Sequence, residues 1–245
     1  TEVVAPLSER KKVPTLAFSM SPHGKDREYV VTFGNPIENG IGAVHQYFQE
    51  KKAKQPGILS VNLGNALEAI DMLQKEIPHL HPIELVKSEL TDFRSLISRL
   101  KSSKADALFV LLLPEQSLSF AKQAKQLHFD VPIIGGDVWA DEQLTAELHK
   151  HLSQVAYVYG DVDRAFIDTY REKYGNASYI FEAACGYEVL SILSSLPSDW
   201  KSQPLAQALK ASTPQHSVLP GLEYEERAGF GPHYSSKVRV YEIAD

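Results

Sequence analysis

The sequence contains a single cysteine, Cys185, in 245 residues, and this scarcity excludes two ways of stabilising a protein. A disulfide framework needs pairs of cysteines, and a cysteine-based metal site needs several of them. Cys185 lies in the apolar segment FEAACGYEVL, where we expect a helix and a small buried side chain rather than a reactive thiol. The fold must therefore be stabilised by burial of apolar side chains.

Long apolar runs and an excess of positive charge are also missing. No apolar run approaches the roughly 18–20 residues that a membrane-spanning helix needs. With 25 Lys and Arg against 31 Asp and Glu, the formal net charge is −6, which disfavours nucleic acid or an anionic membrane as a partner. The chain starts at Thr1 without a methionine or a signal peptide, so we expect a mature or trimmed product.

The motifs of common enzymes are absent from the sequence as well. It has no nucleophile elbow, no Walker loop and no zinc-protease motif. The histidine pairs at 79/81 and 149/151 lie in polar surroundings without a nearby cysteine, which favours solvated side chains over a metal site. Glu182 and Glu188, about two turns apart on a predicted helix, are interpreted as a solvated stripe. The sequence therefore predicts no enzyme, no cofactor and no metal site.

The sequence does contain a regular alternation of helix and buried strand, best seen between Asp92 and Asp137. The apolar residues of DFRSLISRLK recur at i, i+3, i+4 and i+7, which predicts a helix with one buried face. Ala107–Leu113 is an unbroken apolar run, typical of a parallel strand covered on both faces. A second helical stripe and a short strand, Val131–Ile134, follow. This order predicts a βαβ unit within a doubly wound α/β sheet.

The rest of the chain continues this alternation and then departs from it. Its length allows one large or two small domains. Two consecutive helices, Arg164–Tyr174 and Tyr179–Leu193, follow one another without a strand, which indicates that the chain changes domain there. Residues 221–241 are polar and turn-rich, and a strand at Val238–Ile243 closes the chain.

The segments DFRSLISRLK, ADALFVLL and AKQAKQLHFDVPIIGGD, in this order and spacing, carry a resemblance. They are similar to the second lobe of type 1 periplasmic binding proteins, of the branched-chain amino-acid receptor kind that serves ABC transporters. The similarity extends from APLSERKKVPTLAFS through FEAACGYEVLSIL to YEERAGFGP, nearly the whole chain. The resemblance implies an α/β fold of two doubly wound parallel-sheet lobes joined by three crossovers, with a ligand in the cleft between them.

The resemblance also implies how the lobes divide the chain. Residues 1–35 and 159–217 would form the first lobe, and residues 36–158 and 218–245 the second. The second lobe looks complete, whereas the first lacks its opening βα units, which we expect to precede Thr1. A partial sheet of this kind would expose a strand edge and an apolar face that natural proteins normally cover.

Candidate ligand contacts follow from a rule for open α/β sheets, whose ligands bind outside the carboxyl ends of the strands. Ser19 and Ser21 come after the predicted strand Thr15–Phe18, and the resemblance implies that this strand end holds a ligand carboxylate. It also places Thr1 where a carboxylate-binding hydroxyl precedes a helix, a suitable anion site. The alternatives are a helix cap for Thr1 and a simple turn for the two serines.

In the second lobe the same rule selects three side chains. Glu115 follows the strand Ala107–Leu113, and Asp137 and Trp139 follow the next strand along. An acidic group there would pair with a ligand amine, and Trp139 would pack over an apolar or cationic portion. The alternatives are a helix-terminal role for Glu115 and a core position for Trp139. Tyr159 lies where the resemblance implies an aromatic contact.

One departure from the resemblance affects the expected ligand. Amino-acid receptors of this kind generally carry an aromatic residue at the strand end that matches Leu111–Leu113, and this chain has leucines. We expect a periplasmic or otherwise extracytoplasmic protein that passes a small polar ligand, an amino acid or a related compound, to the membrane permease of an ABC transporter. The alternative is a ligand-sensing or protein-interaction module of the same fold that regulates a cell-envelope partner. Neither hypothesis involves nucleic acid or insertion into a membrane.

Overall fold

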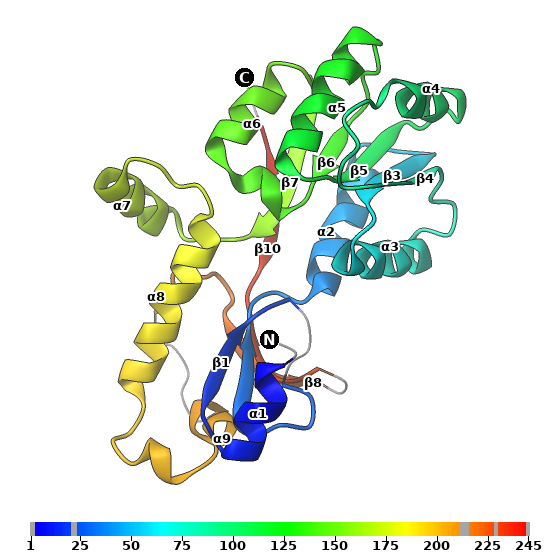
Figure 1. Cartoon of the computed structure of the whole chain (residues 1–245). Coiled ribbons are helices and arrows are strands. Elements are labelled where there is room, and N and C mark those ends of the chain that lie inside the picture. The colour runs from blue at the N-terminus through cyan, green and yellow to red at the C-terminus, as the bar shows by residue number, and fades with distance from the viewer. Residues whose placement is uncertain (1–2, 21–23, 211–215, 228–229, 244–245) are drawn as a thin grey trace. The chain divides into compact units, whose positions relative to one another are not determined.

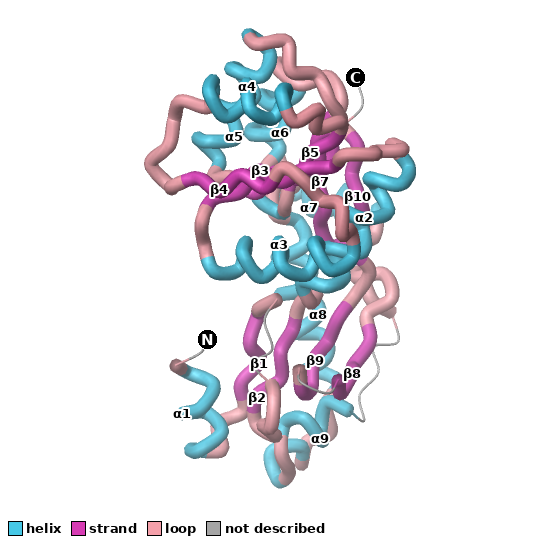
Figure 2. The backbone as a smooth tube through the Cα atoms, turned by 90° about the vertical axis from the view of Figure 1, so that its right-hand side faces the viewer, coloured by secondary structure: helices cyan, strands magenta, loops and turns pink. Residues whose placement is uncertain are grey.

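A computed structural model describes residues 3–20, 24–210, 216–227 and 230–243 (Figures 1 and 2). The chain divides into two compact units. The first comprises Thr1–Asn39 and Gly160–Val238, and the second comprises Gly40–Tyr159 and Arg239–Asp245. Within the described residues, no helix has both the length and the apolar composition needed to cross a membrane.

The second unit is built on a six-stranded sheet with the strand order β10-β7-β6-β5-β3-β4. The neighbouring strands from β4 through β7 are all parallel. Its strands are β3 (Pro56–Val61), β4 (Ile83–Val86), β5 (Ala107–Leu111), β6 (Ile133–Gly135), β7 (Val155–Gly160) and β10 (Val238–Glu242). The predicted doubly wound sheet is therefore confirmed.

Helices cover both faces of this sheet. Figures 1 and 2 show α4, α5 and α6 on one side and α2 and α3 on the other. These elements are α2 (Ile37–Glu50), α3 (Gly64–Glu76), α4 (Arg94–Ser102), α5 (Pro114–Gln126), a 3₁₀ turn η1 (Asp137–Ala140) and α6 (Glu142–His149).

The core of the second unit contains the side chains selected by helical spacing. Phe93, Leu96, Ile97 and Leu100 are all buried in one cluster with the β5 residues Leu108 and Val110. Each fully buried side chain of this size stabilises the fold by about 1.5–3 kcal/mol relative to exposure. The apolar run of β5 is covered on both faces, which explains why it shows no alternation.

The first unit contains a four-stranded sheet with the order β1-β2-β9-β8. Strands β1, β2 and β9 are parallel, whereas β8 and β9 pair as an antiparallel hairpin. Its strands are β1 (Thr15–Phe18), β2 (Val30–Phe33), β8 (Glu223–Arg227) and β9 (Gly231–Ser235). Its helices are α1 (Val4–Lys11), α7 (Arg164–Tyr174), α8 (Ile180–Ser195), the 3₁₀ turn η2 (Trp200–Ser202) and α9 (Leu205–Lys210).

Short contacts attach the helices of the first unit to its sheet. On the α1 side, Ala5 packs with Ala17 and Val30. On the α9 side, the tyrosine hydroxyls of the hairpin donate to helix carbonyls, from Tyr224 to Ala206 at 3.1 Å and from Tyr234 to Leu209 at 3.2 Å. Burial raises the pKa of Tyr234 to about 12, so this hydroxyl remains a donor at any ordinary pH.

The C-terminal region differs from the expected division of the chain. Residues 218–238 were expected in the second lobe, but β8 and β9 join the sheet of the first unit, and the chain returns to the second unit at Arg239. The sequence of β8, EYEER, carries charges, as edge strands often do, and Tyr224 packs against Tyr234 with ring centroids 5.3 Å apart.

The predicted solvated stripe on α8 is wrong for one of its two members. Glu182 is exposed, but Glu188 is fully buried. Glu188 Oε1 accepts hydrogen bonds from Ser217 Oγ at 2.7 Å and from the Val218 N–H. A carboxylate tolerates burial when such donors replace water, and no local pattern on the helix revealed them.

Candidate functional site

In the second unit, four loops open at the same edge of the sheet. Strands β3, β5, β6 and β7 form one parallel ladder, so the residues that follow their carboxyl ends lie at one edge. Two of these connections carry the predicted contacts, since Glu115 follows β5 and both Asp137 and Trp139 follow β6, and Tyr159 lies near the end of β7.

Glu115 lies in the first turn of α5 and is exposed. The turn is fixed by its neighbour Gln116, whose Oε1 accepts from the Leu113 N–H at 3.4 Å. A carboxylate at a helix N-terminus is electrostatically favourable, so the position of Glu115 also fits the helix-terminal role. Its contact with a ligand stays a prediction.

Asp137 opens the 3₁₀ turn η1, directly after β6, and its side chain is exposed. Its Oδ1 accepts from the adjacent Val138 N–H at 2.9 Å. This bond orients the carboxylate while leaving it accessible to solvent, as a ligand contact requires. A contact between Asp137 and a ligand stays a prediction.

Trp139 is placed in the core of the second unit. Only 1% of its surface is exposed, and its Nε1 donates to Ser117 Oγ at 3.0 Å. The indole packs directly over Gly135, where a Cβ would lie 2.2 Å from Trp139 Cδ2. This placement corresponds to the core alternative considered from the sequence, and Trp139 supports the η1 turn that carries Asp137.

Tyr159 belongs to a group of aromatic side chains near the end of β7. It is 6% exposed, and its ring centroid lies 6.4 Å from that of Tyr157. Tyr157 in turn stacks on Tyr241 of β10 at 5.2 Å. Burial, and then the Glu142 carboxylate, raise the pKa of the Tyr157 hydroxyl. These rings form a rigid apolar support next to the strand ends.

Leucines occupy the end of β5, where the sequence departs from the amino-acid receptors that it resembles. Leu112 is buried, whereas Leu111 and Leu113 are half-buried. Leu111 lies against Gly136, where a Cβ would approach Leu111 Cδ2 to 2.9 Å. An aliphatic side chain therefore borders the turn that leads to Asp137.

In the first unit, Ser19 follows β1 and is half-buried. Its N–H donates to Phe33 O at 3.1 Å. Gly34, after β2, has a φ of +138° and passes so close that a Cβ would lie 3.0 Å from Ser19 O, which explains why glycine is required there. Two further predicted contacts, Thr1 and Ser21, lie outside the described residues.

Sequence reasoning missed a buried amide, Asn35, that joins two segments of the first unit. Its Oδ1 accepts from the Ser236 N–H at 2.8 Å, and its Nδ2 donates to Lys237 O at 3.5 Å. The Asp161 N–H donates to the same Lys237 carbonyl at 2.8 Å. The motif Gly34-Asn35-Pro36 signals a turn, but no sequence pattern indicates these partners, which lie about 200 residues away.

The described residues contain no group of three or more His, Cys, Asp or Glu side chains arranged to hold a metal ion. At the strand ends of the second unit, the carboxylates of Glu115 and Asp137 lie near helix N-termini, with leucines at the end of β5 and Tyr159 near the end of β7.

Comparison with known proteins assigns this arrangement to a family. A family model described as periplasmic binding protein matches residues 1–211. A comparison of the sequence with curated proteins gave no match.

Many solved structures share the fold, at low sequence identity. A leucine-binding protein from Thermotoga maritima has a TM-score of 0.78 and 18% identity over 99% of this chain and 73% of that one. A branched-chain amino acid transporter substrate-binding protein from Streptococcus pneumoniae, in complex with isoleucine, has a TM-score of 0.75 and 18% identity over 100% and 72% of the two chains. A solute-binding protein from R. palustris, in complex with benzoate, has a TM-score of 0.74 and 13% identity over 98% and 70%.

Proposed function

Because this chain belongs to the periplasmic binding protein family and has the type 1 fold, we propose that it captures a small polar ligand outside the cytoplasm and delivers it to the permease of an ABC transporter. The family consists of solute-binding proteins. The observation that carries the proposal is the gathering of Glu115, Asp137 and Tyr159 at one carboxyl edge of the parallel sheet.

In this proposal the side chains at the strand ends divide the ligand between them. Ser19, with Thr1 and Ser21, holds an anionic group. Asp137, assisted by Glu115, holds a cationic group, since a carboxylate and an amine form a charge-assisted hydrogen bond. Tyr159 packs beside them, and Trp139 acts from the core as a support for Asp137.

Transport requires that the ligand change the shape of its carrier. One ligand that contacts residues of both units would favour the conformation in which all contacts are made. A ligand shifts a two-state equilibrium only by its differential affinity for the two states, and a few kcal/mol suffice. The three chain crossings near residues 39, 159 and 238 are where such a change in conformation would be accommodated.

The leucines at the end of β5 affect which class of ligand we propose. The aliphatic Leu111 and Leu113 replace the aromatic residue expected for amino-acid receptors, which weakens the case for a branched-chain amino acid. Structural relatives include proteins solved with benzoate and with isoleucine, and one named as a fatty acid ABC transporter substrate-binding protein from Thermomonospora curvata. We therefore extend the candidate class from amino acids to related small carboxylates.

The test is thermal unfolding of the protein against a panel of amino acids, aromatic and aliphatic carboxylates, amides and short peptides. A ligand present at a hundredfold its dissociation constant adds about 2.7 kcal/mol to the free energy of unfolding, which raises the melting temperature measurably. We expect one chemical class to stabilise the protein, and isothermal titration then gives the affinity. A well-folded protein with no shift across the whole panel contradicts the proposal.

The alternative is a ligand-sensing or protein-interaction module of the same fold that regulates a cell-envelope partner. The leucines at the end of β5 favour it, because they remove one expected aromatic contact with an amino acid. The same panel separates the two functions when it is combined with reconstitution. A ligand that stabilises the protein but is not taken up by a matching permease supports sensing.

A further inference from the structure

The connectivity of the six-stranded sheet changes direction between β3 and β5. From β3 the chain passes through α3 to β4 on one side, whereas from β5 it passes through α5 to β6 on the other side. Figures 1 and 2 accordingly show α3 and α5 on opposite faces of the sheet. In open α/β sheets, ligands bind outside the carboxyl ends of the strands where the connectivity reverses. We call residues 61–67 and 111–117, at the carboxyl ends of β3 and β5, the switch point.

Leucines occupy the two positions at which these helices begin. Leu63 is the N-cap residue of α3 and Leu113 is that of α5, and each has an extended backbone conformation. The strand residues Ser60 and Leu111 pair in register. The two N-cap leucines therefore follow neighbouring parallel strands, and both belong to the switch point.

Helix stability does not explain a leucine at an N-cap position. Ser, Thr, Asp and Asn are preferred there, because their side chains accept a hydrogen bond from the first helical turn, which a leucine cannot do. The chain uses such caps elsewhere. Asp141 accepts from the Leu144 N–H at 2.8 Å at the start of α6, and Asp163 accepts from the Ala165 N–H at 2.9 Å at the start of α7. The leucines at the switch point therefore call for another explanation.

Burial in the core does not explain these leucines either. Leu63 is 46% exposed, and Leu67, one turn further along α3, is 40% exposed. On the β5 side, Leu111 and Leu113 are half-buried. The two connections between strand and helix contain no charged residue. The switch point therefore presents aliphatic surface to solvent, as do binding sites that combine apolar side chains with a few polar groups.

The predicted polar contacts lie next to this aliphatic surface. Glu115 is in the first turn of α5, and Asp137 follows β6, which pairs with β5. A Cβ on Gly136 would lie 2.9 Å from Leu111 Cδ2, so the leucine borders the turn that carries Asp137. Neighbouring strands are about 4.8 Å apart, so β6 and β3 lie about 10 Å apart across β5. One small molecule can therefore reach both the carboxylates and the leucines.

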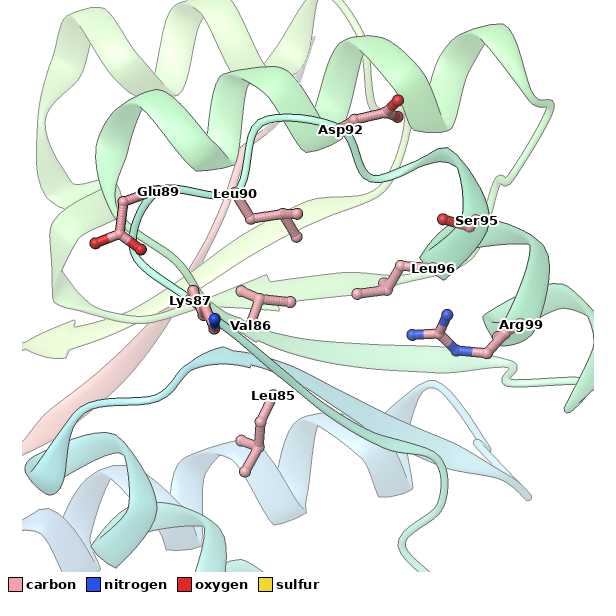
Figure 3. Close-up of a pocket in the computed structure, with 9 residues that line it drawn as sticks. All are labelled: Leu85, Val86, Lys87, Glu89, Leu90, Asp92, Ser95, Leu96 and Arg99. Carbon is pink, nitrogen blue, oxygen red and sulfur yellow. The ribbon is translucent and has the colours of Figure 1, made fainter.

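Another hollow of the second unit provides a different environment. It lies at β4 and is lined in part by Leu85 (Figure 3). Charged side chains of both signs also line it, namely Lys87, Glu89, Asp92 and Arg99. An aliphatic group that entered this hollow would displace water from these charges, which is unfavourable. The switch point is therefore the better site for an aliphatic group.

We propose that the captured ligand carries an unbranched aliphatic group, which packs on Leu63 and Leu113 while its charged end is held by the polar contacts at the strand ends. This inference rests on the proposed function and specifies the ligand class of that same site. Leucine side chains favour a saturated chain over an aromatic ring, because a ring gains additional stacking energy only from other rings.

The probes are two homologous series, the straight-chain 2-amino acids from alanine to 2-aminooctanoate and the straight-chain carboxylates from acetate to octanoate. Each compound is titrated calorimetrically into the whole protein. We expect the dissociation constant within one series to fall about threefold with each added methylene, because each buried methylene adds a similar free energy. Free leucine and benzoate should bind more weakly than the straight-chain compounds with the same number of carbon atoms. Equal affinity along both series, or strongest binding by an aromatic compound, overturns the aliphatic assignment.

The variant Leu63→Asn separates a ligand contact from a structural role. Asparagine is a preferred N-cap residue, so the variant should keep or raise the melting temperature. It should weaken binding of the longest chain about tenfold and leave the shortest compound of the series unaffected. A leucine with a structural role would instead lower the melting temperature when replaced. The control is Leu190→Ala, a leucine of α8 that is 70% exposed, which should change neither quantity.

The same titrations distinguish failure of this inference from failure of the proposed function. Binding of another class of compound, such as a short peptide, with an affinity that depends on Asp137 but not on Leu63, would retain solute capture and overturn the aliphatic group. An unchanged affinity of Leu63→Asn for the longest chain would do the same. Absence of binding by every compound contradicts the proposed function and this inference together.

Discussion

Glu188 on α8 and Ser217 are joined by a buried hydrogen bond, in which Ser217 Oγ donates to Glu188 Oε1 at 2.7 Å. The Val218 N–H donates to the same oxygen, and the Val218 carbonyl accepts from the Asp163 N–H at 2.8 Å. One carboxylate thus fixes the segment 217–219 to α8, next to the start of α7. This segment leads into β8 and β9, so Glu188 positions the part of the chain that completes the first sheet.

Removing this carboxylate should destabilise the first unit. Glu188→Ala leaves the Val218 N–H and the Ser217 hydroxyl without their acceptor, which costs about 1–3 kcal/mol of unfolding free energy. Glu188→Gln retains an oxygen acceptor and should cost less. The measurement is urea unfolding, with Glu182→Ala as control, because this exposed residue of the same helix should change stability by less than about 0.5 kcal/mol. Equal losses for the two alanine variants would contradict the anchoring role.

Gly135 should be intolerant of a side chain. A Cβ there would lie 2.2 Å from the indole of Trp139, so Gly135→Ala must displace the ring or the strand and should cost about 1–3 kcal/mol. Gly42, inside α2, has no heavy atom within 4 Å of a built Cβ. Gly42→Ala should therefore be neutral or stabilise the helix by up to about 1 kcal/mol. Thermal unfolding of both variants decides whether the space around Trp139 is as tight as the structure indicates.

Replacement of Asp137 should weaken ligand binding without unfolding the protein. Once a ligand is identified, Asp137→Ala should raise its dissociation constant at least tenfold, or about 1.4 kcal/mol. Asp137→Asn keeps the oxygen that accepts from the Val138 N–H but removes the charge, so it separates turn geometry from electrostatics. The control is Glu76→Ala, an exposed carboxylate in the last turn of α3. An unchanged affinity in Asp137→Ala removes this residue from the site.

The stability of the protein should fall at alkaline pH because of Cys185. Burial, together with the nearby carboxylates of Glu182 and Glu188, raises the pKa of the Cys185 thiol. The folded thiol therefore keeps its proton where the unfolded thiol, with a pKa of about 8.5, loses it. Since the unfolded state then binds fewer protons, the free energy of unfolding decreases as pH rises above about 8.5.

A comparison with Cys185→Ala isolates this contribution of the thiol. The stability difference between wild type and variant should be constant below about pH 8 and should shrink by about 2 kcal/mol at pH 10. Chemical denaturation at pH 7.5 and pH 10 provides the measurement. A difference that does not change with pH would show that the thiol titrates alike in both states.

The sequence by itself determined the elements and their order in the second unit. The spacing of Phe93, Leu96, Ile97 and Leu100 defines a buried helix face, and the run at Ala107 defines a strand covered on both sides. Both patterns are local, because a residue's periodicity relative to its neighbours decides which face of an element is buried. The positions of Glu115 and Asp137 at strand ends followed from the same reasoning.

Only the tertiary structure decided where polar side chains and edge strands find their partners. Glu188 was predicted to be solvated and is buried, because its donors come from residues 217 and 218. Residues 218–238 join the first sheet, because β9 pairs with β2. Trp139 lies in the core, where its indole N–H donates to the hydroxyl of Ser117, 22 residues earlier in the chain. These outcomes depend on contacts between residues distant in sequence. The free energy of burying a polar side chain is set by the hydrogen-bond partners that it finds in the folded structure, and the neighbouring residues in the sequence do not reveal those partners.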